Sequence, residues 1–174
     1  VQMMVRDYFE PQQFLPSYPA VPNDMYNPEF QVYRGFWMVS WFVKEFAAED
    51  KKEAEEKGWL VERVLDSHLN DVPAGCDGLV LQPYWTPGIA NPLAKGAIIG
   101  FSDVHTRRHV YRAIVEGIDL ALLDGMKTME KRSGKKITEI FVGGGGSKSP
   151  VVCQILANVT GVPVRCIQTH EACG

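Results

Sequence analysis

Four consecutive glycines near the end of the chain are its strongest candidate for ligand chemistry. They lie in the stretch FVGGGGSKSP, residues 141–150. Glycine lets a ligand approach the backbone closely, and the free N–H groups at the start of a helix favour an anion. If a strand precedes this stretch and a helix follows it, the loop could hold the phosphates of a nucleotide. A tight strand-to-helix turn without a ligand is the alternative that the loop alone leaves open.

The loop fits neither of the two common nucleotide-binding motifs. A Walker A loop requires G-x-x-x-x-G-K-[ST], but Ser147 precedes Lys148 and Val142 occupies the place of the first glycine. The dinucleotide motif G-x-G-x-x-G requires a third glycine where this chain has Lys148 or Ser149. The kind of nucleotide site must therefore be inferred from the surrounding sequence.

A second candidate is the pair His105 and His109, which could place two imidazoles on one face of a helix. No glutamate follows His105 as the H-E-x-x-H motif requires, and Arg107 and Arg108 between the histidines disfavour a cation. We therefore predict no metal site here, and expect His109 to serve in helix capping or packing.

Composition limits the class of protein and its partners. The 174 residues are 45% hydrophobic and 22% charged with a net charge of -3, which is typical of one soluble globular domain and argues against a nucleic-acid binder. No apolar run approaches the roughly 18 residues that cross a bilayer, so we expect no membrane partner. The cysteines at 76, 153, 166 and 173 form no C-x-x-C motif, which favours reduced thiols in a cytoplasm.

The amino-acid composition changes twice within the first third of the chain. Residues 1–30 carry five of the eleven prolines and predict an extended, turning connection. Residues 30–48 are rich in aromatic and aliphatic side chains, which predicts a buried helix whose aromatic residues pack in the core. The charged run EDKKEAEEKG that follows predicts a solvated helical segment.

The remaining sequence predicts alternating helices and strands. In the longest helix, Val110, Ile114, Ile118, Leu122 and Met126 recur at every fourth position, and Arg108, Arg112, Glu116 and Asp119 lie elsewhere on the helical wheel. That helix should end at Gly134. The predicted order is helix 59–69, strands 77–84 and 96–101, helix 106–132, strand 136–142, a helix after the glycines, and strand 162–167. A strand, helix and strand in succession imply a right-handed crossover between parallel strands, and therefore an α/β fold.

Two motifs in register resemble the FGGY carbohydrate kinases. Residues 96–116, GAIIGFSDVHTRRHVYRAIVE, are similar to the second signature of that family, with Phe101 as a departure because a smaller aliphatic residue is usual there. The glycine loop is similar to the family element G-G-G-[AS]-x-S-P. The signature positions that match are Gly96, Ile98, Gly100, His109, Val110, Ala113, Ile114, Val115 and Glu116.

The resemblance implies a partial ribonuclease H-like (actin-like ATPase) domain, the C-terminal and nucleotide-binding one of a two-domain sugar kinase. Such kinases use ATP and Mg²⁺ to phosphorylate a sugar or polyol held between the two domains. By similarity, the backbone of Gly144, Gly145 and Gly146 would line the adenosine and α-phosphate, and Ser149 would lie near the adenine. The catalytic aspartate and the first domain would precede residue 1, so we expect no catalytic residue here and an isolated chain without activity.

The sequence leaves several points open. The segment TPG at 86–88 departs from the G-E-R-x-P loop common in xylulose kinases, so the acceptor could be xylulose, ribulose, glycerol or another polyol. A homodimer is possible. Two alternatives remain: an actin-like ATP-binding switch that is not a kinase, and a vestigial kinase that serves as an interaction module.

Overall fold

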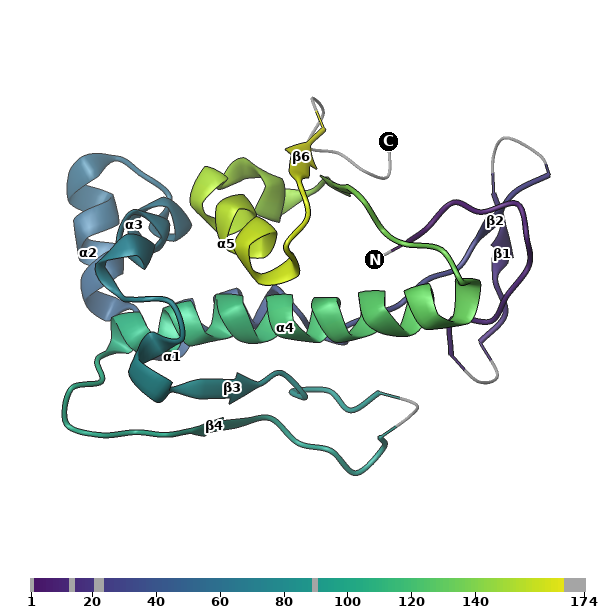
Figure 1. Cartoon of the computed structure of the whole chain (residues 1–174). Coiled ribbons are helices and arrows are strands. Elements are labelled where there is room, and N and C mark those ends of the chain that lie inside the picture. The colour runs from purple at the N-terminus through teal and green to yellow at the C-terminus, as the bar shows by residue number, and fades with distance from the viewer. Residues whose placement is uncertain (1, 13–14, 21–23, 89–90, 168–174) are drawn as a thin grey trace.

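The computed structural model describes residues 2–12, 15–20, 24–88 and 91–167, which Figure 1 shows as a long central helix with smaller elements on either side. In chain order the elements are β1 (Tyr18–Pro19), β2 (Tyr26–Asn27), α1 (Trp37–Phe46), α2 (Ala48–Lys57), α3 (Val61–Ser67), η1 (Leu69–Asp71), η2 (Cys76–Gly78), β3 (Val80–Gln82), β4 (Ala97–Ile99), α4 (Arg107–Ser133), β5 (Ile140–Val142), η3 (Gly145–Lys148), α5 (Pro150–Thr160) and β6 (Val164–Cys166).

The strands of the described residues form three pairs. β3 and β4 are antiparallel, with Val80 opposite Ile99, while β5 and β6 are parallel, with Ile140 opposite Val164. Helix α5 connects the two parallel strands, so the predicted strand, helix and parallel strand are confirmed. The described part of the proline-rich start is mostly extended and forms the short antiparallel pair β1 and β2 together with isolated bridges such as that between Val5 and Tyr26.

Helix α4 is the axis of the molecule. In Figure 1 the β3–β4 pair runs along one side of it, and α5 lies on the other. The predicted every-fourth-residue face is confirmed, because Ile114, Ile118 and Met126 are buried. The helix ends where expected, at Gly134 with a φ of 68°. Although long, α4 carries many charges, and no helix in the described part of the chain could span a membrane.

The predicted helix over residues 30–48 is shorter and less buried than expected. α1 begins only at Trp37, and Ala47, with φ −102° and ψ 36°, separates it from α2. Met38 and Phe42 are buried, whereas Phe36 and Phe46 are exposed. Core packing therefore accounts for one face of the aromatic run and not for the other.

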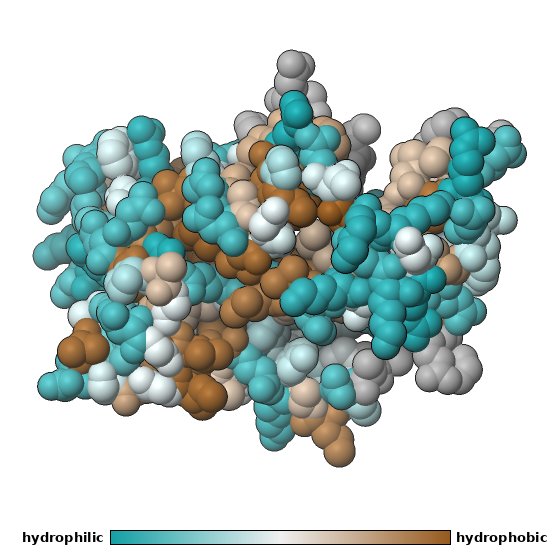
Figure 2. Space-filling view, in the orientation of Figure 1, coloured by the Kyte–Doolittle hydropathy of each residue, from teal (hydrophilic) through white to brown (hydrophobic). Residues whose placement is uncertain are grey.

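The charged run behaves as predicted with one exception. α2 is mostly exposed and forms the hydrophilic end of the face in Figure 2, on the left in that view. Asp50, however, is only 1% exposed. The prediction of a fully solvated segment is wrong at this residue, because Asp50 in the first turn of α2 faces the start of α4.

Two polar residues of α4 are also buried. Arg112 donates from a terminal nitrogen to the Leu69 carbonyl at 2.6 Å and from Nε to Glu116 at 2.7 Å, so its charge is fully partnered. Asp119 is 1% exposed, and neither carboxylate oxygen has a hydrogen-bond partner among the residues that the structure describes. Burial, and to a lesser degree the neighbouring Glu116, raises the pKa of Asp119 to about 7.

We predict that Asp119 makes the protein less stable as the pH rises from about 4 to about 7. The folded state keeps a proton that the unfolded state releases near pH 4, so the free energy of unfolding falls across this window. Asp119→Asn should remove the dependence, and at pH 8 should be more stable than wild type by up to about 4 kcal/mol, the equivalent of about three pKa units.

Urea unfolding at pH 4 and pH 8 measures this effect. Asp124→Asn is the matched control, because Asp124 lies on the same helix but is exposed, and it should leave the pH dependence unchanged. Equal pH dependence in wild type and Asp119→Asn would contradict the prediction.

Candidate functional site

The glycine loop joins the end of β5 to the start of α5. Gly144 has φ 81° and ψ −164°, a backbone conformation that is essentially restricted to glycine. Residues Gly145–Lys148 then form the single 3-10 turn η3. The chain therefore passes from the end of β5 into α5 within a few residues.

Two serines fix the shape of this loop. The Ser147 hydroxyl is buried and donates to the Gly144 carbonyl at 2.7 Å, which closes the turn. Ser149 is the N-cap of α5, where its hydroxyl oxygen accepts a hydrogen bond from the Val152 N–H at 3.3 Å. Pro150 at the first helical position needs no such partner.

Ser149 also connects the loop to the rest of the domain. Its side chain helps to lower the pKa of Asp66 of α3, and Asp66 accepts a hydrogen bond from the Tyr111 hydroxyl of α4 at 2.7 Å. Burial is the larger effect and raises the pKa of Asp66. The predicted ligand residue Ser149 thus has a structural role, and its contact with a nucleotide remains a prediction.

The backbone of the loop is open on one side. Among the described residues, a methyl group in place of a hydrogen at Gly144 or Gly145 would meet no atom within 4 Å, whereas at Gly146 it would lie 3.8 Å from the Phe36 ring. The structure thus leaves space for a ligand beside Gly144 and Gly145. It brings the three predicted glycines and Ser149 together in one turn, and their role as ligands stays a prediction.

A groove of about 390 Å³ adjoins the loop at Phe36. Its walls are residues 31–36, in the turn before α1, together with Ile118 and Leu122 of α4. Figure 2 shows apolar side chains gathered over the middle of the molecule, around α5 and the adjoining part of α4. Aromatic and aliphatic walls with a few polar groups suit a planar base and its sugar.

Sequence reasoning missed this groove, because residues 31–36 were expected to belong to a buried helix. The turn is closed by a hydrogen bond from the Gly35 N–H to the Val32 carbonyl at 3.1 Å, and Arg34 adopts a φ of 62°. The Arg34 guanidinium lies 4.7 Å from the centre of the Trp37 ring. The available signal was Gly35, a turn residue placed directly before the aromatic run.

The electrostatics of the loop favour an anion. α5 has eleven residues, and the positive end of its dipole lies at the loop, although Pro150 has no N–H and the Val152 N–H is already bonded to Ser149. Lys148 is exposed beside them. A phosphate at this end of the helix would meet both the partial positive charge of the helix dipole and the full charge of Lys148.

Two residues of the family signature, Gly100 and Glu116, contact the turn before β3. Gly100 has a φ of 99°, and a methyl group there would come within 2.3 Å of the Gly78 carbonyl oxygen. Glu116 accepts a hydrogen bond from the Gly75 N–H at 3.0 Å. The first contact packs the turn before β3 against the end of β4, and the second fixes it to α4, so these signature positions serve the frame of the domain.

His109 caps α4, as predicted. The Thr106 N–H donates to His109 Nδ1 at 3.1 Å, which leaves Nε2 to donate to Asp77 at 3.3 Å. His105 likewise accepts from the Ser102 N–H at 2.8 Å. In the part of the chain that the structure describes, no group of three or more His, Cys, Asp or Glu residues is arranged to hold a metal ion.

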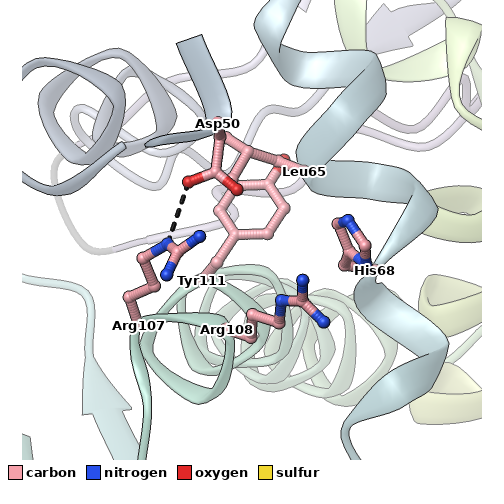
Figure 3. A pocket seen from close by; sticks show the side chains of 6 residues that line it. All are labelled: Asp50, Leu65, His68, Arg107, Arg108 and Tyr111. Carbon is pink, nitrogen blue, oxygen red and sulfur yellow. Dashed lines mark hydrogen bonds and ion pairs between the residues drawn. The ribbon is translucent and has the colours of Figure 1, made fainter. Parts of the chain in front are cut away.

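A second, much smaller cavity lies between α2, α3 and the start of α4, as Figure 3 shows. Its volume is about 10 Å³, enough for about one water molecule and too little for a substrate. Its walls include the buried carboxylate of Asp50, which accepts from Arg107 Nε at 3.0 Å, and Arg108, which is paired with Asp71 at 3.0 Å. The cluster is therefore a structural junction.

Comparison with known proteins establishes the family. The model of the FGGY family of carbohydrate kinases, C-terminal domain, matches residues 4–174, so the chain belongs to this family. An uncharacterized sugar kinase of Escherichia coli K12, YgcE, is 26% identical over 156 residues, which cover 90% of this chain and 32% of the relative. A xylulose kinase of Lactococcus lactis is 34% identical over 112 residues, which cover 62% of this chain and 22% of the relative.

Solved structures agree with this assignment. The xylulose kinase from Rhodospirillum rubrum superposes with a TM-score of 0.68 at 28% identity, over 87% of this chain and 29% of its own. The gluconate kinase from Lactobacillus acidophilus superposes with a TM-score of 0.76 at 24% identity, over 98% of this chain and 33% of its own. The predicted actin-like α/β fold is confirmed. The chain spans about a third or less of the length of these relatives.

We predict that Gly144 and Gly145 respond differently to substitution. Gly144→Ala should lower the free energy of unfolding by about 1–3 kcal/mol, because alanine is strained at the backbone angles of Gly144. Gly145→Val should leave it nearly unchanged, because the space beside Gly145 is open. Chemical denaturation of both variants tests the loop geometry, and equal effects at the two positions would contradict it.

We also predict that the pair of Asp50 and Arg107 stabilises the fold more than the pair of Asp71 and Arg108. Arg107→Ala leaves a buried carboxylate without its partner and should cost about 3 kcal/mol or more. Arg108→Ala, the control, removes an ion pair to a half-exposed aspartate and should cost at most about 1 kcal/mol. Thermal and urea unfolding measure the free energy of unfolding of both variants. Similar decreases would contradict the prediction, because they would show that the burial of Asp50 does not make its ion pair more stabilising.

Proposed function

We propose that the protein containing this chain transfers the γ-phosphoryl group of ATP to a hydroxyl of a sugar or polyol, and that this chain supplies the nucleotide-binding side of the active site. The chain is then a partial C-terminal actin-like domain. The observation that carries the proposal is an open glycine loop at a helix N-terminus, beside a groove, in a member of the FGGY family.

The groove and the loop would bind different parts of the nucleotide. The base and ribose would occupy the groove next to Phe36 and Gly146, and the phosphates would pass along the open backbone of Gly144 and Gly145 toward the start of α5. Only residues without a Cβ permit this approach. Ser149 would hold the helix start in position through its hydrogen bond with Val152.

Phosphoryl transfer requires positioning, neutralisation of charge by Mg²⁺ and a base near the attacking hydroxyl. The described residues include no cluster of carboxylates suited to a metal, so this part of the chain does not fit a Mg²⁺ site of its own. We assign the metal-holding groups, the catalytic base and most of the sugar-binding residues to the first domain. A cytoplasmic location and a homodimer remain predictions.

The proposal predicts that the protein with both domains releases ADP from ATP only when an acceptor sugar or polyol is present. Pentuloses, gluconate and glycerol form a suitable panel for a coupled ADP assay. Gly145→Val should raise the KM for ATP roughly tenfold or more, equivalent to about 1.4 kcal/mol, because the valine side chain fills the ligand space.

The KM for the sugar and the Tm of Gly145→Val should stay unchanged, and Gly145→Ala should give an intermediate KM for ATP. Nucleotide binding without turnover on any acceptor would favour an ATP-driven switch. Absence of nucleotide binding would favour a vestigial interaction module. Either result would overturn the proposal.

A further inference from the structure

Two cysteines lie in contact immediately behind the glycine loop. Cys153 on α5 and Cys166 on β6 are 13 positions apart in the sequence, and their sulfur atoms are 3.3 Å apart. A disulfide bond is about 2.05 Å long, so the two sulfurs need to approach by only about 1.2 Å to form one.

The two thiols differ in accessibility. Cys166 is exposed and lies opposite Val142, the last residue of β5, in the register of the parallel pair. Cys153 is buried, with its sulfur 3.9 Å from the Gly146 carbonyl oxygen. Burial and, to a lesser degree, the contact with Cys166 raise the pKa of Cys153 to about 12. An external reagent therefore meets Cys166 first.

We propose that Cys153 and Cys166 form a redox modification site that reacts with a low-molecular-weight disulfide and becomes an intramolecular disulfide between α5 and β6. This bond would connect the two elements that follow the loop. The inference rests on the positions of the two sulfurs and stands independently of the kinase assignment.

The chemistry is two successive exchanges. The Cys166 thiolate attacks one sulfur of the small disulfide, which forms a mixed disulfide and releases one small thiolate. Cys153 then loses its proton to solvent and attacks the Cys166 sulfur, which forms the protein disulfide and releases the second thiolate. The small disulfide is reduced by two electrons, and the two cysteines are oxidised by the same number. Because the second step needs a deprotonated Cys153, the rate should rise with pH.

The test equilibrates the protein in buffers with increasing ratios of oxidised to reduced glutathione, blocks free thiols with an alkylating reagent and maps peptides by mass spectrometry. A Cys173→Ser background is required, because Cys166 and Cys173 would otherwise share one tryptic peptide. We expect peptide 149–165 to be joined to the peptide that starts at Cys166, with the loss of two free thiols. The Tm should rise by roughly 5 °C and return to its starting value on reduction.

Three variants control the test. Cys166→Ser and Cys153→Ser should each abolish the linked peptide and the rise in Tm, and Cys166→Ser is the safer variant because that side chain is exposed. Cys76→Ser should change neither the linked peptide nor the rise in Tm. The Cys76 sulfur belongs to a different contact, with Glu116 at 3.6 Å. The proposal is overturned if both thiols stay alkylatable in the most oxidising buffer, if Cys166 carries only glutathione, or if either cysteine pairs with Cys76.

Discussion

The structure depends on the enclosure of helix α4 between β3 on one side and α5 on the other. On the strand side the approach is so close that a methyl group at Gly117 would lie 2.7 Å from the Leu81 carbonyl oxygen. Charged residues of the same helix reach across to backbone groups, as Arg112 does to Leu69 and Glu116 to Gly75. Because a closely packed interior has no free volume for independent movement, the position of α4 determines where its neighbours lie.

The glycine loop is positioned by that frame. The Tyr111 hydroxyl of α4 donates a hydrogen bond to Asp66 of α3, and the electrostatic influence of Ser149, the residue that caps α5, also reaches Asp66. The loop therefore keeps its shape through hydrogen bonds of the fold, while the backbone of Gly144 and Gly145 stays open for a ligand. Ordering a loop of glycines costs conformational entropy. Because the hydrogen bonds of the fold hold the loop in one shape, its backbone can still be a defined binding surface.

Local sequence signals predicted the local structure well. The cap of α4 at His109, its end at Gly134 and the parallel strands around α5 all follow from patterns within a few residues. The errors came from contacts between distant segments. The partner of Asp50 is Arg107, 57 positions away, and nothing in the run EDKKEAEEKG distinguishes that aspartate from its solvated neighbours. The groove beside Phe36 likewise needs α4 as its second wall.

The central claim is that the open backbone beside Phe36 holds a nucleotide. A crystal structure of the protein with a non-hydrolysable ATP analogue and Mg²⁺ tests it most directly. The account predicts the base in the groove next to Phe36, and ribose or phosphate oxygens against the backbone of Gly144, Gly145 and Gly146. A nucleotide bound elsewhere, or a loop that stays covered by neighbouring side chains in the presence of saturating analogue, would contradict it.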